Sequence, residues 1–192
     1  PSVYGVGILG TKYLSTISGV KTKEYELWNS MLTRCYSGSF KKKRTMYEGC
    51  EVSDNFKSYE YFYEWCNSQI GFAVDGFELD KDLLLKGNKI YSEDTCCFIP
   101  QEINTLLLTS KRIRGDNPIG VFYHNRDKKY VAKCKVNNKT VHLGYHLTAT
   151  EAFFAYKEFK ESYIKEIANK WKDQIDIRVY EALMSWEVSI ND

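Results

Sequence analysis

The sequence predicts a mixed α+β protein of 192 residues. Two kinds of pattern point to this class. Apolar side chains recur every three or four residues in 24–36, 55–67 and 152–171, which predicts amphipathic helices. Short stretches between 119 and 145 alternate apolar and polar side chains around turn residues, which predicts three strands. Hydrophobic residues make up 43% of the chain and aromatic residues 15%, enough for packed cores.

Composition narrows the class of protein further. The chain has no run of 18 apolar residues and no basic segment followed by an apolar one near its start, so we expect neither a membrane span nor a secretory signal. Its six cysteines lack the paired spacing of zinc sites, and reduced, buried thiols are the favoured interpretation. The net charge is only +2, but acids dominate 48–82 and bases dominate 111–146. This segregation indicates one part that meets a polyanion and another that holds a cation.

The first part of the chain predicts an arm and two helices. Residues 1–22 are rich in glycine and predict an extended arm that packs on the core or tracks along DNA. The helix over 24–36 carries one apolar face, formed by Trp28, Met31, Leu32 and Cys35. Ser53 or Asp54 caps the predicted helix over 55–67. Its expected core stripe is Phe56, Tyr59, Tyr63 and Cys66, which Tyr61, Phe62 and Trp65 widen.

Basic side chains of this part are candidates for phosphate contacts. Arg34 lies off the apolar face of its helix. Lys42, Lys43 and Arg44 belong to a basic run that starts at Lys41, in a predicted loop. A solvated surface is the alternative. Phosphate contacts dominate the affinity of proteins for nucleic acids, so a basic run of this kind is a candidate for such contacts.

The segment from Glu78 to Leu108 predicts strand, loop, strand and helix. Leu79-Asp80 is followed by a hairpin-like stretch through Gly87 and Asn88, and then by the short apolar strand 97–99. Pro100 stands at the expected first helical position, with Asn104 in the following turns. Carboxylates and an amide stand at the two ends of this layout, which is that of a ββα-metal site.

This segment resembles the HNH homing endonucleases of phages. The matching residues are Leu79-Asp80-Lys81, Tyr91 to Cys96 and Gln101 to Asn104, and upstream Trp28 to Tyr36 and Tyr47 to Cys50. The resemblance implies a metal-dependent hydrolysis of DNA, with Mg²⁺ or Mn²⁺ as cofactor, in the cytoplasm of a phage-infected bacterial cell. It covers about residues 25–108.

The resemblance also implies roles for individual residues. Asp80 and Asn104 take the positions of the two metal ligands, and oxygen ligands suit Mg²⁺. Lys81 stands where the group has its general-base histidine, and Thr95 stands where it has the residue that orients this histidine. The three catalytic positions are therefore Asp80, Lys81 and Thr95. Further oxygen ligands are near in sequence: Asp82, Asn88, Glu93 and Asp94.

The sequence divides into two domains joined by a basic linker. Residues 1–108 form the arm and the HNH-like core, 109–118 the linker, and 119–192 a second domain that ends in a helix at about 173–188. The linker carries Lys111, Arg112 and Arg114 and ends in a turn-forming Gly-Asp-Asn-Pro sequence. We expect it to follow a DNA groove or to serve as a plain tether.

The second domain predicts three antiparallel strands and a helix. The strands are Ile119–His124, Lys129–Val136 and Thr140–Tyr145, and Thr148 to Glu151 has the spacing of a capping box. The pattern resembles the AP2-type DNA-binding domain of plant regulators and phage homing endonucleases. The matching residues are Gly120-Val121, Tyr130 to Ala132, Leu143-Gly144, Thr150 to Ala152 and Ala155-Tyr156.

Strict alternation along the strands predicts which side chains face the helix. These are Val121, Tyr123, Tyr130, Ala132, Cys134, Leu143 and Tyr145. The opposite face then carries Phe122, His124, Lys133, Lys135, Thr140 and His142, with Arg126 in the adjoining turn. Such a face can enter the major groove of double-stranded DNA. A half-solvated sheet with ordinary surface lysines is the alternative.

Three functions follow as hypotheses. The first is a DNA endonuclease or nickase with an HNH-like core and an AP2-like targeting domain. The second is a DNA-binding regulator or inhibitor whose catalytic centre has degenerated, because Lys81 and Thr95 depart from the pattern of the group. The third is a protein-binding module that uses the acidic part of the chain. The oligomeric state is open in each.

Overall fold

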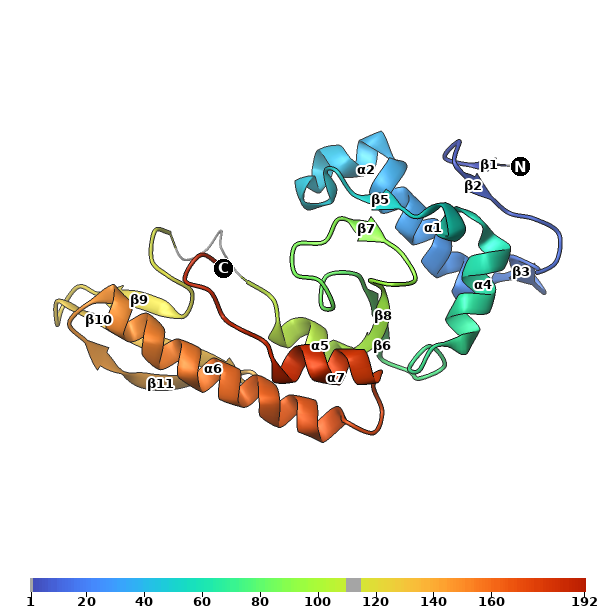
Figure 1. Ribbon diagram of the computed structural model, residues 1–192. Coiled ribbons are helices and arrows are strands. Elements are labelled where there is room, and N and C mark those ends of the chain that lie inside the picture. The colour runs from blue at the N-terminus through green and yellow to red at the C-terminus, as the bar shows by residue number, and fades with distance from the viewer. Residues whose placement is uncertain (1, 110–114) are drawn as a thin grey trace. The chain divides into compact units, whose positions relative to one another are not determined.

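The computed structural model describes residues 2–109 and 115–192, and shows a mixed α+β chain that divides into two compact units. The first unit holds the chain up to Gln101 together with Asp173–Val179, and the second holds Glu102–Lys172 and Tyr180–Asp192. The elements are labelled in Figure 1. The division expected from the sequence places 102–108 in the first domain and 173–179 in the second. The contacts between residues place 102–108 in the second unit and 173–179 in the first.

The N-terminal arm folds into two small hairpins. Strand β1 (Ser2–Val3) pairs with β2 (Gly7–Ile8), and β3 (Thr16–Ile17) pairs with β4 (Val20–Lys21). Glu60 Oε1 accepts the backbone N–H groups of Thr11 at 2.8 Å and Lys12 at 2.7 Å. Of the two expectations for the arm, packing on the core is the one observed.

Helix α1 (Lys23–Tyr36) forms where the sequence predicts it. Thr22 caps it by accepting the N–H of Tyr25, and the expected apolar face is buried throughout: Trp28, Met31, Leu32 and Cys35. The next segment corrects an expectation. Residues 41–43 belong to the short helix α2 (Gly38–Lys43), not to a loop, because Ser37 caps a new turn and lysine is a good helix former. The 3₁₀-helix η1 (Thr45–Tyr47) follows.

The helix expected over 55–67 is two helices, α3 (Asp54–Lys57) and α4 (Tyr59–Ser68). Ser53 caps the first, and Ser58 ends it and caps the second. The break rotates the stripe, so that the buried set is Phe56, Tyr59, Phe62, Trp65 and Cys66, while Tyr63 is only half-buried. The expectation that Tyr63 belongs to the core and Phe62 and Trp65 to its margin is therefore wrong.

Two pairs of short strands complete the first unit. Strand β5 (Glu51–Val52) runs parallel to β7 (Ile90–Tyr91). Strand β6 (Phe77–Asp80) pairs antiparallel with β8 (Cys97–Pro100), so that Asp80 lies opposite Cys97. Helix α5 (Gln101–Leu106) begins directly after β8. Pro100 is thus the last strand residue, one position before the helix, and not the first helical one.

Aromatic rings form the core of the first unit. Phe56 contacts Phe62 and Trp65 at centroid distances of 5.1 and 4.7 Å, and Trp65 contacts Phe98 at 5.7 Å. Trp28 is fully buried beside them, and its Nε1 donates to the Phe56 carbonyl at 2.8 Å. This cluster ties α1, α3 and α4 to β8, the strand that lies against β6 and its terminal Asp80.

The second unit is built on a three-stranded antiparallel sheet in the order β11-β10-β9. The strands are β9 (Val121–His124), β10 (Lys129–Val136) and β11 (Lys139–His146). The 23-residue helix α6 (Ala149–Trp171) starts at the predicted capping box of Thr148 and Glu151 and packs along the sheet (Figure 1). The core between them holds Val121, Ala132, Cys134, Ala152, Phe153, Tyr156 and Val188.

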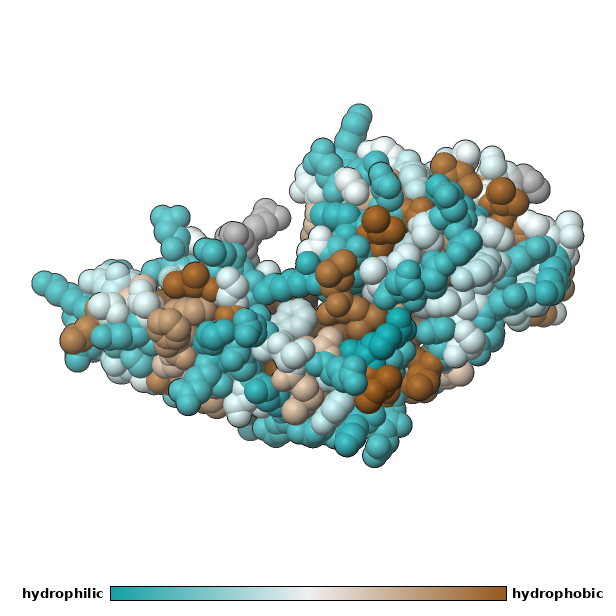
Figure 2. All heavy atoms as spheres, in the orientation of Figure 1, coloured by the Kyte–Doolittle hydropathy of each residue, from teal (hydrophilic) through white to brown (hydrophobic). Residues whose placement is uncertain are grey.

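The final helix is shorter than the sequence pattern suggests. Helix α7 spans Ile177–Met184, while residues 185–192 continue without regular structure. The expected stripe holds for Ile175, Val179 and Leu183, which are all buried. On the visible face of each unit, apolar side chains form small groups separated by hydrophilic ones (Figure 2).

The cysteine side chains are buried thiols, as expected from the sequence. All six cysteines are free and buried, none more than 3% exposed. Burial raises the pKa of Cys35 and of Cys96 to about 12, and also raises the pKa of Cys66, Cys97 and Cys134. Among the helices described, none combines the length and the apolar character that a bilayer span requires.

Candidate functional sites

Asp80 ends strand β6 and is held by the turn that follows it. The backbone N–H groups of Asp82 and Leu83 donate to its Oδ1 at 2.8 and 2.7 Å. These two bonds fix the orientation of the carboxyl group. Burial raises the pKa of Asp80 above its ordinary value, although the two donors oppose that change. A cation beside this carboxyl group would favour its ionised form.

Lys81 closes the loop between β6 and β7. Its side chain is buried, and Nζ donates to the Asn88 carbonyl at 2.8 Å and pairs with the Asp82 carboxylate. In return, Asn88 Nδ2 donates to the Lys81 carbonyl at 2.8 Å. The ammonium also lies 5.7 Å from the centroid of the Tyr91 ring. These contacts give Lys81 a structural task, because its charge and its protons serve to hold the loop.

Thr95 lies in the next connection along the chain, the turn between β7 and β8. Its hydroxyl donates to the Ile90 carbonyl at 2.8 Å and shares a hydrogen bond of 2.8 Å with Ser92 Oγ. The backbone N–H of Cys96 also donates to the Ser92 carbonyl at 2.8 Å, which makes this a closed turn before β8. Thr95 therefore holds the turn between β7 and β8, through the bonds of its hydroxyl to Ile90 and Ser92.

The predicted metal pair falls on the two sides of the division. Asp80 belongs to the first unit, and Asn104, on α5, belongs to the second. Within residues 2–109 and 115–192, no group of three or more His, Cys, Asp and Glu side chains is arranged to hold a metal. Asn104 is an amide and lies outside that set of residue types. Metal binding by Asp80 and Asn104 stays a prediction.

The Glu93 carboxylate accepts hydrogen bonds from several side chains, which the sequence pattern did not indicate. Ser53 Oγ donates to its carboxylate at 3.1 Å, Tyr61 OH donates at 3.3 Å, and the Asn55 amide donates as well. Burial alone would raise the pKa of Glu93, but these hydrogen bonds lower it. Glu93 therefore remains ionised and ties its turn to the start of α3 and to α4.

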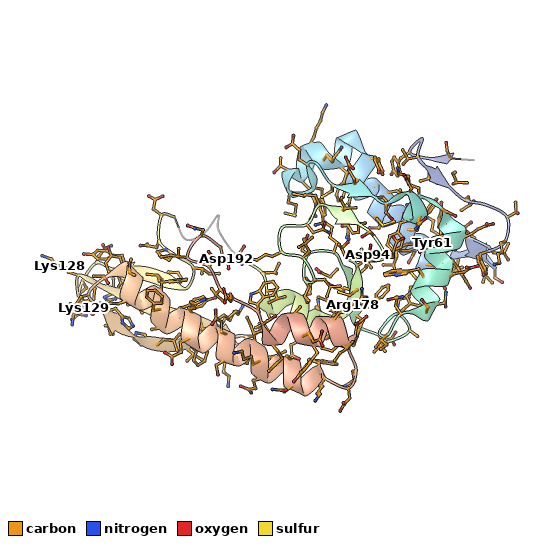
Figure 3. All side chains as sticks on the ribbon, viewed as in Figure 1. Tyr61, Asp94, Lys128, Lys129, Arg178 and Asp192 are labelled. Carbon is orange, nitrogen blue, oxygen red and sulfur yellow. The ribbon has the colours of Figure 1, made fainter. Side chains whose placement is uncertain are left out.

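Arg178 is a basic residue of the first unit that sequence reasoning missed. Its guanidinium pairs with the Asp176 carboxylate, at 2.9 Å between Nη2 and Oδ2, and Nη1 donates to the Asp94 carbonyl at 3.5 Å. Figure 3 labels Arg178 and Asp94. The separation of 84 positions explains why no local pattern indicated this contact. Asp94 thus contributes a backbone carbonyl here.

The basic candidates of the first unit differ in their surroundings. Arg34 is half-buried, and its Nη1 donates to Tyr91 OH at 3.4 Å while its guanidinium lies 5.6 Å from the Tyr47 ring centroid. Lys42, Lys43 and Arg44 are exposed. No ion pair with a carboxylate is found for these four side chains within the described ranges. The linker candidates Lys111, Arg112 and Arg114 lie outside the described residues.

The sheet of the second unit has one face against α6 and one turned away from it, which we call the free face. Val131 pairs with Phe122 on one side and with Tyr145 on the other, so these three side chains form one row across the free face. Lys133 pairs with His142, and Lys135 with Thr140. His124 pairs with Lys129. The predicted assignment of Phe122, His124, Lys133, Lys135, Thr140 and His142 to one face agrees with this register.

Tyr145 lies on the face of the sheet opposite to the predicted one. Strict alternation places it against the helix, but the register between β10 and β11 shifts by one residue between Val131 and Lys133. The extra residue on β11 lies at Leu143-Gly144, where Gly144 has a φ of +110°. Such a bulge reverses the side to which all later residues point. Tyr145 therefore lies on the free face, where its ring centroid is 4.9 Å from that of His142 and 5.9 Å from that of His124.

Charge on this sheet is strongly positive. Residues 119–146 contain six bases and one acid, Asp127, whose carboxylate lies 3.1 Å from His124 Nδ1. Lys128 and Lys129 project from the end of the β9–β10 hairpin (Figure 3), and Arg126 is exposed in the same turn. Lys133 Nζ lies 5.8 Å from the Phe122 ring centroid. Exposed rings interleaved with bases suit a polyanion that also offers apolar or aromatic surface.

Comparisons with known proteins identify no relative, since no family model, curated protein or solved structure matches the chain.

Proposed function

We propose that the protein binds double-stranded DNA through the free face of the sheet in the second unit. The observation that carries the proposal is the composition of that face. Exposed lysines, two histidines and two aromatic rings share it, and the one acid of the sheet region is engaged with His124 at its margin. Lysines supply contacts to phosphates, while histidine and aromatic side chains can reach base edges in the major groove.

The architecture supports the same proposal. A sheet of three antiparallel strands with one helix on its back leaves one face for a duplex. The resemblance of the sequence to AP2-type domains adds to this support. The helix α6 stabilises the sheet from behind, so the free face needs no rearrangement before it meets a duplex. Arg34, Lys42, Lys43 and Arg44 of the first unit are further candidates for phosphate contacts.

A salt titration tests the binding. Anisotropy of a labelled duplex of mixed sequence, measured over a range of KCl concentrations, gives the slope of log K against log salt concentration. The double variant Lys133→Gln/Lys135→Gln removes two bases of the free face, and we expect it to reduce the steepness of that slope by about 2.

The matched control removes two charges elsewhere on the same unit. Lys165 and Lys172 are exposed, one on α6 and one directly after it, and Lys165→Gln/Lys172→Gln should leave the slope unchanged. Equal losses in the two variants would show that net charge alone drives association. Binding by the wild-type protein that is weak and insensitive to salt would refute the proposal.

A second candidate function is metal-dependent cleavage of DNA by the first unit. The observation in its favour is the antiparallel pair β6 and β8, which is followed in the chain by α5 and carries an oriented, half-buried carboxyl group at the end of β6. Asp80 would hold the cation, and Mg²⁺ or Mn²⁺ would supply charge stabilisation at the phosphate and a bound water. Lys81 and Thr95, the predicted base and its orienting group, are engaged in the loop contacts described above.

Asp80→Asn tests this candidate. Asparagine keeps an oxygen that can accept the N–H groups of Asp82 and Leu83, but it removes the charge that a cation requires. We expect nicking of supercoiled plasmid with Mg²⁺ or Mn²⁺ to fall by roughly a hundredfold or more. Because burial raises the pKa of Asp80, the wild-type rate should also decline as the pH falls through that raised pKa and the carboxylate takes up a proton.

Asp75→Asn is the control, since Asp75 is an exposed acid of the same unit and the substitution is the same. It should leave nicking intact. Wild-type protein that retards the plasmid but never nicks it would reject cleavage and leave the binding proposal standing.

A further inference from the structure

The row of Phe122, Val131 and Tyr145 is the least expected feature of the free face. The two rings are 45% and 50% exposed, while Val131 between them is 2% exposed. Lysines alone would suffice for a surface that only tracks phosphates. A row of apolar side chains across the middle of a basic face therefore calls for a second kind of contact. We call these three residues the apolar row.

Neighbouring side chains restrict how the rings can be used. The Lys133 ammonium lies over the Phe122 ring, at 5.8 Å from its centroid. The Tyr145 ring is flanked by His142 at an interplanar angle of 52° and by His124 at 74°. Parallel stacking of an unpaired base needs an open ring face, which these neighbours partly occupy. Contact with a small apolar group does not need one, and it leaves the imidazoles and the ammonium in place.

We propose that the two exposed rings of the apolar row, Phe122 and Tyr145, read the 5-methyl group of thymine in the major groove. This inference rests on the proposed binding of duplex DNA by the same face. The methyl group is the only apolar feature that a base pair displays in the major groove, and apolar side chains distinguish thymine by contacting it. The flanking Lys129, Lys133 and Lys135 then meet the phosphates on either side.

The probes are two alternating duplexes, poly(dA-dT) and poly(dA-dU). They carry the same phosphate charge and the same hydrogen-bonding groups, and they differ only in the 5-methyl group. Burial of one methyl group corresponds to about a fourfold gain in affinity. We expect the wild-type protein to bind the thymine duplex at least fourfold more tightly, in competition anisotropy at fixed salt concentration.

Two substitutions and one matched control test whether the apolar row causes the preference for the thymine duplex. Phe122→Ser and Tyr145→Ser should each bring the ratio of the two affinities towards 1 and leave the salt dependence unchanged. Tyr123→Ser is the control, because Tyr123 is adjacent to Phe122, has the same exposed fraction of 45%, and contacts Tyr130 on the helix side of the sheet. It should keep the wild-type ratio. Circular dichroism checks that each variant is folded.

Each other outcome has a definite meaning. Equal affinity for the two duplexes, with steep salt dependence, would overturn methyl readout while leaving DNA binding intact. Failure to bind either duplex would overturn the proposed function as well. Tighter binding to single-stranded poly(dT) than to the duplexes would show that the rings stack on unpaired bases, and would also overturn the inference.

Discussion

Replacement of Gly120 by alanine is expected to destabilise the second unit by about 2–5 kcal/mol, the sum of two separate costs. Gly120 has a φ of +75°, where an L side chain costs roughly 1–2 kcal/mol. A Cβ atom at this position would also lie 2.1 Å from Cδ2 of Tyr156, a buried residue of α6. Forcing the ring away costs a further ~1–3 kcal/mol, as overpacked cores do.

Gly115→Ala separates the two costs. Gly115 has a φ of +63°, and among the described residues no atom lies within 4 Å of its ideal Cβ position, so alanine there meets the backbone cost alone. Thermal unfolding followed by circular dichroism should show a clearly larger loss for Gly120→Ala than for Gly115→Ala. Equal losses would mean that Tyr156 moves aside without cost and that the close approach of β9 to α6 is not a fixed feature.

The second large effect is expected for Trp28→Ala in the first unit. Trp28 is fully buried, and truncation of a buried tryptophan leaves a cavity and costs about 3–5 kcal/mol. The substitution also removes the donor to the Phe56 carbonyl, which Trp28 Nε1 meets at 2.8 Å. Trp28 joins α1 to α3, and the arm residue Gly7 packs on it. We therefore expect the substitution to lower the free energy of unfolding of the whole first unit.

Two companion variants resolve the causes. Trp28→Phe retains an aromatic ring and removes the hydrogen bond, so it should cost less than alanine, with about 1–3 kcal/mol due to the unpaired carbonyl. Leu14→Ala, at a side chain that is 68% exposed, should change the free energy of unfolding by no more than ~0.5 kcal/mol. If urea unfolding gave Trp28→Ala no larger an effect than Leu14→Ala, the core assignment would be wrong.

The sequence predicted most of the elements because their signals are local. The capping box at Thr148 and Glu151, the apolar face of α1 and the bounds of β10 all depend on residues a few positions apart. The break at Ser58 was missed because Phe56 and Tyr59, on its two sides, are both fully buried and keep a helical spacing. A serine before each helix was the available signal.

The orientation of Tyr145 was missed for a different reason. Period-2 counting assumes an unbroken strand, and a bulge becomes visible only through the pairing of two strands. The signal in the sequence was Gly144, a glycine inside a strand whose residues otherwise alternate between apolar and polar. The error matters, since it removed from the predicted DNA-binding face one of its two most exposed rings.

The roles expected around Asp80 came from resemblance, and the structure adds contacts that no pattern contained. The mutual bonds of Lys81 and Asn88 depend on how the intervening loop closes. The pairing of Arg178 with the Asp94 carbonyl joins positions 84 apart. Such contacts follow from tertiary packing, so spacing and composition could not have indicated them.

The burial of all six cysteines has a practical consequence for solution experiments. Thiol-reactive dyes attack the thiolate, and the side chains that would form it are at most 3% exposed. A cysteine introduced at an exposed position, such as Asn138 in the β10–β11 turn, should therefore be labelled selectively while the native six remain in place. The unmodified chain is thus already suited to site-specific fluorescent or spin labels next to its sheet.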